Sequence, residues 1–495
     1  MSEAEQQIQS VAAVVVLAAG GGTRMKSRTS KLLHQVAGRS LLSYAVDAAT
    51  ALEPVHLCVV VGHLKEQVEA HLDDIAPHVV RALQEEQKGT GHAVQCGLAA
   101  MPDLHGEVVV TYGDVPMLTG DTLTSIVAAH RAEGNAVTVL TSFVDDPTGY
   151  GRVVRRSGGD TDDGGIERIV EQKDATEDEQ AILEINSGIY VFDVDTLRGG
   201  LASLSTDNAQ GELYLTDVVG YANAQGGRVG AYVTGDRWQT EGVNDRVQLA
   251  AMSREMNRRI VERWQRDGVT IWDPATTWIE DSVDLAPDVT LLPNTILRGA
   301  TSVGSGAQIG PDTMLTDVEV GEDAHVTRCQ ASLAVIGAGA EVGPYSYLRP
   351  GTELGAKGKI GGFVETKNAR IGDGAKVPHL TYCGDAVVGE GANIGAGTIF
   401  ANYDGVTKST TTIGRQSFVG SNSVLVAPVH VADGAYVAAG SALTDDVGPG
   451  ELAVARGRQR NIGGWVADKR AGTKTDAAAR AALAAVQAAE GDQEG

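Results

Sequence analysis

The stretch LAPDVTLLPNTILRGATSVGSGAQIGPDTML, residues 285–315, has an aliphatic residue at every sixth position. The residues that hold this register are Leu285, Leu291, Leu297, Val303, Ile309 and Leu315. This period is neither that of a helix nor that of a heptad, but it is typical of a solenoid of short strands that each point one aliphatic side chain inward. No repeat can bury its apolar row alone, so the stacking of coils makes the core. The stretch therefore predicts a β-solenoid.

The same spacing resumes after a slip and continues to about residue 455. The later register positions are Val320, Val326, Ile336, Val342, Leu348, Leu354, Ile360, Val388, Ile394, Phe400, Ile413, Val419, Leu425, Val431, Val437 and Leu443. A small residue often follows the aliphatic one, as in Ile309-Gly310. The alternative is an ordinary β-rich domain with chance spacing, and the unbroken registers disfavour it.

The composition narrows the class of protein. The chain has 495 residues, which is room for two or three domains. Glycine is abundant at 62 residues and aromatic residues are scarce at 4%, as expected for flat coils that need small corner residues. The net charge is −24, whereas a nucleic-acid binder would normally be basic, so nucleic acid is disfavoured as a partner.

Two further features concern the compartment. The four cysteines form no CxxC pair, and no histidine cluster has zinc spacing. The first residues, MSEAEQQIQS, lack the basic and apolar segments of a secretory signal, and the apolar run 11–20 is too short to span a bilayer. We therefore expect a cytoplasmic protein with reduced thiols and no membrane insertion.

The chain before the solenoid alternates strand-like and helix-like segments. Short apolar runs of buried-strand type occur at residues 11–17, 57–62, 107–111 and 136–142, with helical patterns between them. This alternation predicts an α/β fold with a largely parallel sheet. The predicted domains are residues 1–240, a helical arm at 241–267, the solenoid at 268–470, and an Ala-rich tail at 471–495 that is disordered or loosely helical.

A glycine-rich turn, LAAGGGTRM at residues 17–25, follows the first predicted strand. Such a turn lets backbone N–H groups approach phosphate oxygens, and Arg24, Lys26 and Lys31 add positive charge. The turn is neither GxGxxG nor GxxxxGKS/T, so it supports neither a dinucleotide-binding Rossmann site nor a P-loop. Taken alone, a plain tight turn is an equally good interpretation.

Two other segments favour a nucleotide site. The polar loop LQEEQKGTGHA (83–93) opens a predicted helix. The segment YGDVP (112–116) follows a strand, so Asp114 is expected at the carboxyl end of that strand, the usual ligand edge of such sheets. A turn carboxylate without a ligand is the alternative for Asp114.

Together these segments resemble the sugar-1-phosphate nucleotidyltransferases, whose motifs are LAAGxGTRM, LQxEQxGTGHA and GDVP. The match extends through GYGR (149–152), EQKD (171–174), NSG (186–188) and EGVN (241–244). With the six-residue repeat behind them, the chain to about residue 465 resembles the bacterial bifunctional N-acetylglucosamine-1-phosphate uridylyltransferase / glucosamine-1-phosphate N-acetyltransferase.

The resemblance implies a fold and an assembly. The fold is an α/β nucleotidyltransferase domain, Rossmann-like with a mostly parallel sheet, plus a C-terminal left-handed parallel β-helix of hexapeptide repeats. The assembly is a homotrimer whose acetyltransferase sites lie between subunits. Handedness comes from the resemblance alone, since the general rule for parallel crossovers favours a right-handed connection.

The resemblance also implies roles in uridylyl transfer. Asp114 and Asn244 would hold Mg²⁺ through hard oxygen ligands, and Lys31 would neutralise triphosphate charge with Arg24 and Lys26 in support. The other residues implied to bind UTP or the N-acetylglucosamine moiety are Leu17, Ala18, Ala19, Gly20, Gln84, Gly89, Thr90, Gly151, Glu171 and Asn186. The sugar phosphate attacks the α-phosphorus of UTP, so positioning and charge neutralisation carry most of the catalysis.

The glycine-rich loop departs from the family at two positions. Gly21 stands where the family often has a charged residue, and Ser30 stands where proline usually precedes the lysine. We therefore expect a more mobile loop in which Lys26 shares the role of Lys31.

The solenoid carries a dense polar stretch between residues 345 and 382. Arg349 and Lys367 are 18 residues apart, so coils of about that length would stack them on one face, where two cations could hold a sugar phosphate. His379 is the candidate general base, because acetyl transfer to an amine needs the unprotonated amine and imidazole titrates near neutrality. Glu365 would orient His379, and a purely structural histidine is the alternative.

The resemblance places two substrates in the solenoid. Glucosamine-1-phosphate would contact Arg349, Lys367, Tyr382 and Asn393, and acetyl-CoA would contact Ala396, Asn402, Tyr403, Ser421, Ala439 and Arg456. The segment FANYDGVTKSTTT (400–412) interrupts the six-residue register and is expected to loop out. The basic cluster RGRQR (456–460) suits the phosphates of CoA, with a solvated charge run as the alternative.

We therefore predict a bifunctional enzyme of UDP-N-acetylglucosamine synthesis. Acetyl transfer from acetyl-CoA to glucosamine-1-phosphate is followed by Mg²⁺-dependent uridylyl transfer from UTP to N-acetylglucosamine-1-phosphate. One alternative is a single-activity nucleotidyltransferase whose β-helix is structural or regulatory, and His379, the looped segment and the arginine cluster disfavour it. Another is a non-catalytic scaffold, which the complete set of nucleotide motifs disfavours.

Overall fold

The computed structural model describes residues 10–156 and 165–491. The chain divides into two compact units, residues 1–339 and 340–495. The predicted boundaries at residues 240, 267 and 470 follow function rather than compactness and stay predictions. The prediction that residues 1–10 are not a secretory signal concerns residues outside the described part of the chain, except for Ser10. The last residues of the predicted tail, 492–495, also lie outside it.

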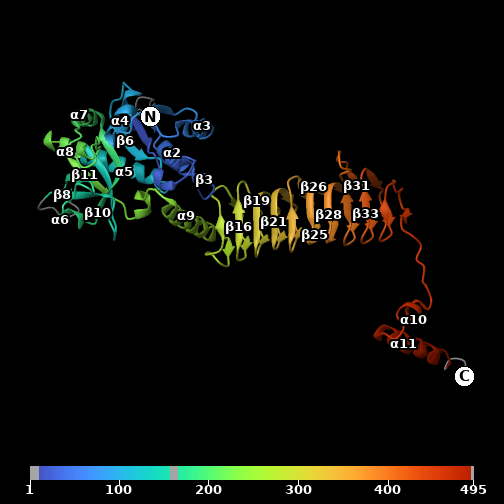
Figure 1. The fold of residues 1–495 in the computed structure, drawn as a ribbon. Coiled ribbons are helices and arrows are strands. Elements are labelled where there is room, and N and C mark those ends of the chain that lie inside the picture. The colour runs from blue at the N-terminus through green and yellow to red at the C-terminus, as the bar shows by residue number, and fades with distance from the viewer. Residues whose placement is uncertain (1–9, 157–164, 492–495) are drawn as a thin grey trace. The chain divides into compact units, whose positions relative to one another are not determined.

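A mixed sheet forms the centre of the N-terminal part, as predicted from the alternating strands and helices (Figure 1). Its strands run in the order β11 (Val229–Val233), β7 (Val137–Phe143), β10 (Glu184–Asp193), β6 (Glu107–Tyr112), β1 (Ala13–Ala18), β4 (His56–Val61) and β5 (Val80–Leu83). All neighbours on this path pair in parallel except β10, which is antiparallel to both β6 and β7. The sheet is therefore mostly parallel, with one reversed strand in the middle.

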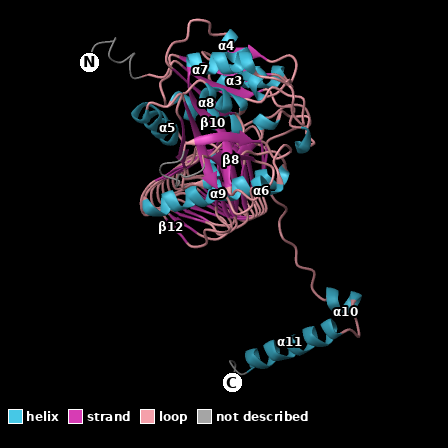
Figure 2. Cartoon of the chain, turned by 90° about the vertical axis from the view of Figure 1, so that its left-hand side faces the viewer, coloured by secondary structure: helices cyan, strands magenta, loops and turns pink. Residues whose placement is uncertain are grey.

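Helices cover both faces of this sheet, which explains why its strands are continuous apolar runs. On one face Val15 and Val60 pack with residues of α4 (Thr90–Ala99), α7 (Val194–Ser203) and α8 (Asp217–Ala224). On the other face Val14, Val16 and Val59 pack with α2 (Leu41–Thr50), α3 (Lys65–Ile75) and α5 (Gly120–Glu133). Figure 2 shows α3, α4, α5, α7 and α8 around strands β8 (Gly151–Arg155) and β10.

The predicted arm is one helix, α9 (Arg246–Arg266). It begins after Asp245, whose carboxylate accepts hydrogen bonds from the backbone N–H groups of Val247 and Gln248, both at 2.9 Å. This cap satisfies two of the first N–H groups, which have no partner inside a helix. Met252 of α9 is buried against Val36, Leu41, Met117 and Val243 in one cluster.

The solenoid begins with parallel strands in the first unit. Trp278–Ile279 (β13) pairs with Thr295–Arg298 (β16), and β16 pairs with Thr313–Val320 (β19), each time 18 residues further along the chain. The register residues Leu297, Ile309 and Leu315 are fully buried, as predicted. The slip that follows is a shorter coil, because Gln308 pairs with His325, 17 residues further on.

The second unit continues the same pattern. Two rows of parallel strands carry the predicted acetyltransferase residues. One row is β22 (Glu341–Val342), β25 (Lys359–Gly362), β27 (Lys376–His379), β29 (Asn393–Ile394), β32 (Phe418–Val419), β35 (Tyr436–Val437) and β37 (Leu452–Ala453). The other is β23 (Ser346–Leu348), β26 (Glu365–Ile371), β28 (Tyr382–Val388), β30 (Ile399–Ala401), β33 (Val424–Val426) and β36 (Ala442–Leu443). The all-parallel pairing confirms a parallel β-helix, and its left-handedness stays an expectation from the family.

The predicted looped segment lies between β30 and β31 (Thr411–Ile413). Its ends are closed by an antiparallel bridge between Tyr403 and Lys408. Beyond β37 the Ala-rich tail forms α11 (Lys474–Gly491), and the prediction that it is disordered or loosely helical stays a prediction. None of the helices in the described part of the chain combines the length and the apolar character needed to span a bilayer.

Candidate active sites

A cavity of 330 Å³ lies at the carboxyl ends of β1, β5 and β6. Most of the residues predicted to bind UTP or metal line it: Leu17, Ala18, Ala19, Gly20, Lys31, Gln84, Gly89, Thr90, Asp114 and Asn244. These residues come from segments more than 200 positions apart in the chain, and the sheet topology brings them together at one edge. The cavity is therefore where parallel sheets usually bind ligands.

Two glycines allow the backbone to close around this cavity. Gly22 has a φ of +57°, and a Cβ there would lie 2.8 Å from the Cβ of Lys31. Gly89 has a φ of +102°, and a Cβ there would lie 2.6 Å from the carbonyl oxygen of Leu213. Both positions combine a left-handed backbone with a close approach, so any side chain would displace the loop.

Positive groups face the two candidate metal ligands. The Nζ atom of Lys31 forms an ion pair with the carboxylate of Asp114, and both side chains are mostly buried. The guanidinium of Arg24 donates a hydrogen bond of 2.8 Å to the amide oxygen of Asn244. The backbone N–H of Val243, beside Asn244, donates to the carbonyl of Asp114 at 3.0 Å. The two loops are thus joined directly.

The donor set fits Mg²⁺ that is shared with a substrate. A carboxylate and an amide oxygen are hard ligands, and Mg²⁺ is usually bound through one or two carboxylates plus phosphates and water. Among the described residues no cluster of three or more His, Cys, Asp or Glu side chains is arranged for a metal. The residues therefore suit a metal completed by triphosphate oxygens rather than a closed protein cage.

The residues predicted to bind the sugar are Gly151, Glu171 and Asn186, and none of them is among the residues that line this cavity. Gly151 of β8 pairs with Asn186 of β10. The carboxylate of Glu171 accepts a hydrogen bond of 3.4 Å from the hydroxyl of Thr216. Burial raises the pKa of Glu171, and the carboxylates of Asp174, Asp217 and Glu212 raise it further, although the Thr216 hydrogen bond opposes them. Glu171, Asp174, Asp217 and Glu212 thus form an acidic cluster, in which the pKa of Glu171 is raised.

Lys26 does not line the 330 Å³ cavity. It lines an adjacent cavity of 440 Å³ with Gly21, Ser30 and Lys31. Lys31 is common to both cavities. The prediction that Lys26 shares the role of Lys31 is therefore untested by this arrangement and stays a prediction.

Several lining residues were not singled out from the sequence: Leu32, Gln87, Ala93, Tyr112 and Glu212. The side-chain amide of Gln87 donates a hydrogen bond of 2.7 Å to the carbonyl of Ala19, which ties the polar loop to the glycine-rich turn. Gln87 and Tyr112 belong to segments that were recognised as motifs, at 83–93 and 112–116. Membership of these motifs was the only signal in the sequence that could have identified them. Glu212 lies in a loop without such a signal.

The second candidate site is on the coils of the second unit. Leu348 pairs with Thr366, so the next residues, Arg349 and Lys367, fall in register as predicted. The ammonium of Lys408, from the looped segment, lowers the pKa of Lys367, and Arg349 adds to this effect. Three cations therefore converge here, and Lys408 was missed because the six-residue period says nothing about where a loop folds back.

Two amides and a carboxylate lie beside these cations. Asn402 and Asn368 both donate hydrogen bonds to the carboxylate of Asp385. Burial opposes ionisation of Asp385, but these hydrogen bonds and the charges of Lys367 and Lys408 lower its pKa on balance. Tyr403 is exposed, and its hydroxyl donates to the carbonyl of Gly405 at 2.5 Å.

His379 lies at the end of β27 with its side chain exposed. Its backbone carbonyl accepts hydrogen bonds from the N–H of Gly397 at 3.1 Å and the hydroxyl of Thr381 at 2.8 Å, which hold its main chain. The carboxylate of Glu365 bonds to Arg349 at 2.9 Å. Within the described residues we find no contact from Glu365 to the ring of His379, so its orienting role stays a prediction. Tyr382 pairs with Glu365, and Asn393 pairs with Lys376.

Three of the predicted acetyl-CoA residues, Ala396, Ser421 and Ala439, follow one corner of the last coils. The backbone N–H of Asn422 donates to the carbonyl of Ala396 at 2.7 Å, and that of Gly440 donates to the carbonyl of Ser421 at 2.8 Å. Ala439 and Arg456 are exposed next to this row. A Cβ at Gly440 would lie 3.9 Å from the Cδ of Arg456, so the first arginine of the basic cluster adjoins the corner.

Comparisons with known proteins show which family the chain belongs to. Residues 14–176 match the model of the MobA-like NTP transferase domain. A protein of Corynebacterium efficiens, "Bifunctional protein GlmU", is 55% identical over 486 residues, which cover 97% of this chain and 99% of the relative. The protein of the same name from Mycolicibacterium gilvum is 57% identical over 475 residues, covering 95% and 94% of the two chains. This chain belongs to the GlmU family.

The family that the motifs predicted is thereby confirmed. The name of these GlmU relatives includes "bifunctional", and the match spans the solenoid as well as the nucleotidyltransferase part. The alternatives of a single-activity enzyme and of a non-catalytic scaffold are not supported. A solved UDP-glucose pyrophosphorylase complexed with UDP-glucose is 18% identical, covers 50% of this chain and 99% of its own, and has a TM-score of 0.40, a likeness too weak to add to the assignment.

Proposed function

We propose how the two sites of this bifunctional N-acetylglucosamine-1-phosphate uridylyltransferase and glucosamine-1-phosphate N-acetyltransferase divide the work. The observation that carries the uridylyl half is the meeting of Lys31, Asp114 and Asn244 in one cavity with the glycine-rich turn. This arrangement supports a site for a triphosphate and a divalent cation. The acetyl half takes place on the coils around His379.

In uridylyl transfer, Asp114 and Asn244 would hold Mg²⁺, which would supply positive charge to the phosphates. Lys31 leaves its ion pair with Asp114 to neutralise the triphosphate, and Arg24 and Lys26 assist. Backbone groups of residues 17–20 bind the phosphates, while Gln84 and the backbone of Gly89 and Thr90 recognise uracil. The phosphate oxygen of the sugar attacks the α-phosphorus of UTP, and the bond to pyrophosphate breaks.

The N-acetylglucosamine moiety lies beside Gly151, Glu171 and Asn186. Burial raises the pKa of Glu171, and its carboxyl can accept hydrogen bonds from the sugar hydroxyls.

In acetyl transfer, the cations Arg349, Lys367 and Lys408 bind the phosphate of glucosamine-1-phosphate, with Tyr382 and Asn393 on the sugar. The amine nitrogen of glucosamine-1-phosphate attacks the thioester carbonyl, and the ring of His379 accepts a proton from this amine. The C–S bond breaks, and the CoA thiolate takes up a proton. Acetyl-CoA lies along Ala396, Asn402, Tyr403, Ser421 and Ala439, with Arg456 on its phosphates.

Two further features belong to this proposal. The enzyme acts as a homotrimer in the cytoplasm, so that the exposed ring of His379 meets groups of a neighbouring subunit.

Separating the two activities tests the proposal. Asp114→Ala should abolish uridylyl transfer while acetyl transfer continues, and His379→Ala should lose roughly 10² to 10⁴ in acetyl transfer, the usual contribution of a general base, with uridylyl transfer near normal. Asp121→Ala, on the exposed start of α5, is the control for Asp114. Coupled assays of pyrophosphate and thiol release measure both rates. Equal Mg²⁺-dependent turnover in Asp114→Ala and the parent would refute the metal assignment.

A further inference from the structure

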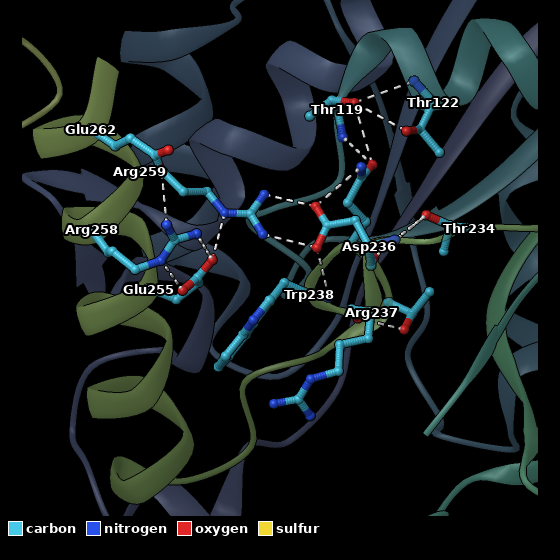
Figure 3. A network of polar contacts seen from close by, with 12 residues as sticks. Thr119, Thr122, Thr234, Asp236, Arg237, Trp238, Glu255, Arg258, Arg259 and Glu262 are labelled. Carbon is cyan, nitrogen blue, oxygen red and sulfur yellow. Dashed lines mark hydrogen bonds and ion pairs between the residues drawn. The ribbon is translucent and has the colours of Figure 1, made fainter. Parts of the chain in front are cut away.

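The arm helix α9 is bonded to the loop that precedes Asn244. Figure 3 shows the guanidinium of Arg259 facing the carboxylate of Asp236 in a two-pronged contact. The Nη1 atom donates to one carboxylate oxygen at 2.7 Å, and the Nη2 atom donates to the other at 2.8 Å. The Nε atom of Arg259 donates to Glu255 at 2.7 Å, so the guanidinium is also held from its own helix.

Asp236 in turn shapes the short helix η3 (Arg237–Thr240). Its carboxylate accepts hydrogen bonds from the backbone N–H of Trp238 at 3.3 Å and from the side-chain amide of Gln239 at 3.4 Å. Four residues after η3 the chain reaches Asn244. The position of Asn244 therefore follows from how η3 is held.

Gln239 connects this loop to the one that carries Asp114. Its side-chain oxygen accepts hydrogen bonds from both the N–H and the hydroxyl of Thr119, each at 3.3 Å. Thr119 is the N-cap of α5, five residues after Asp114. One chain of contacts, Arg259–Asp236–Gln239–Thr119, thus braces both loops that bear the candidate metal ligands.

Apolar packing alone fixes the orientation of these two loops less tightly than the polar contacts do. Trp238, Val243 and Met117 pack with Met252 of α9 in one cluster. Such contacts are not directional, whereas a guanidinium that bonds both oxygens of a carboxylate fixes distance and orientation together. The polar chain supplies the orientation that the apolar cluster lacks.

We propose that Arg259 is a positioning residue for uridylyl transfer, which holds Asn244 and Asp114 at the spacing that Mg²⁺ and UTP require. The inference rests on the proposed metal site. It makes the arm helix part of the uridylyltransferase machinery, although α9 contributes no residue to the lining of the cavity. Outer-shell groups of this kind set how well a preformed site binds its metal.

The neighbouring arginine provides a matched control. Arg258 bonds Glu255 at 2.8 Å and Glu262 at 2.8 Å, both on α9, and no contact to Asp236 is found among the described residues. Arg258→Met and Arg259→Met each remove one guanidinium from the same turn, and in each variant Glu255 loses one of its two arginine partners and keeps the other. Only Arg259→Met breaks the link to η3.

The test uses the full chain with the metal and UTP as probes. In Arg259→Met the Mg²⁺ concentration for half-maximal uridylyl transfer should rise about tenfold, the lower end of what loss of an outer-shell partner costs, with kcat at saturating Mg²⁺ near the parent value. Mn²⁺ binding in the presence of UTP, followed by electron paramagnetic resonance, should weaken by the same factor. Arg259→Lys keeps the charge without the planar fork and should fall between parent and Arg259→Met. Acetyl transfer by the same samples should be unchanged.

Each outcome is decisive. Parent-like Mg²⁺ and Mn²⁺ binding in Arg259→Met overturns the inference, and so does an equal loss in Arg258→Met, which would indicate a general effect on the helix. Asp114→Ala is measured alongside. If Asp114→Ala is inactive while Arg259→Met behaves as the parent, the metal site stands and the positioning role fails. If Asp114→Ala is fully active, the proposed metal site itself fails.

Discussion

Lys31 and Asp114 are ion-paired in the nucleotide cavity although 83 residues separate them in the chain. Their side chains are 13% and 15% exposed, so the pair is largely shielded from water. A shielded pair holds the carboxylate of Asp114 in one orientation before any cation arrives. In the proposed reaction this ion pair is replaced by two new contacts. Lys31 then pairs with a phosphate of UTP, and the carboxylate of Asp114 binds Mg²⁺.

Lys31→Met tests this exchange. The variant keeps much of the side-chain volume but removes the charge, so the triphosphate loses one of its cations in the transition state. We expect kcat/KM for UTP in uridylyl transfer to fall about 10²-fold, comparable with the loss of one charge-stabilising donor. Acetyl transfer should not change. The Lys26→Met variant is the comparison, and a larger loss there than in Lys31→Met would assign the main role to Lys26.

Lys408→Ala tests the third cation of the acetyltransferase site. Its ammonium lowers the pKa of Lys367, because the two cationic side chains lie close together. We expect KM for glucosamine-1-phosphate to rise about tenfold, equivalent to about 1.4 kcal/mol, with little change in KM for acetyl-CoA. Lys359→Ala is the control, because Lys359 is ion-paired with Glu341 at 2.6 Å elsewhere on the coils. Unchanged KM in Lys408→Ala would exclude a phosphate contact.

The solenoid core could be predicted residue by residue. Leu297, Ile309 and Leu315 are fully buried because the six-residue period is a local signal: each strand repeats the same in–out choice. The antiparallel course of β10 between β6 and β7 was not predicted. An alternation of strands and helices shows that a sheet forms, but it does not show where one strand inserts.

The sites were predicted as far as motifs reach. Asp114 and Lys31 were found through segments that resemble a family, and the structure brings them into one cavity. Glu212 and Lys408 could not be found in this way, because each comes from a loop whose position depends on tertiary packing. The contact between Asp236 and Arg259 has the same cause, since neither residue belongs to a motif.

Glu171 makes the stability of the nucleotidyltransferase part depend on pH. Burial raises its pKa in the folded state, so the folded state favours the protonated carboxyl. The stabilisation is fully present below the ordinary pKa of glutamate, about 4.3, and is lost as the pH rises through the raised value. Glu171→Gln cannot ionise and should escape this loss.

The measurement compares thermal midpoints of Glu171→Gln and the parent between pH 4 and 8. We expect the difference to grow in favour of Glu171→Gln as the pH rises, and then to level off. Glu177→Gln, in the exposed first turn of α6 (Glu177–Gln180), is the control and should show no such trend. A difference that is constant with pH would contradict the raised pKa of the buried Glu171.

Arg456 adjoins the corner of the coils that carries Ala439 and Ser421, so its predicted contact with acetyl-CoA can be tested by itself. If it binds the phosphates of CoA, Arg456→Ala should raise KM for acetyl-CoA about tenfold, as expected for one charge-assisted contact of about 1.4 kcal/mol. Added salt should raise the parent's KM as screening grows and should affect the variant less. Acetyl-pantetheine lacks the nucleotide phosphates, so its KM should be the same for both proteins. Arg415→Ala is the matched control, since Arg415 is equally exposed but is bonded to Asp433 at 2.8 Å on the neighbouring coil. An equal loss with acetyl-CoA and acetyl-pantetheine would show that Arg456 supports the coil itself, and an unchanged KM for both would return the basic cluster to a solvated surface.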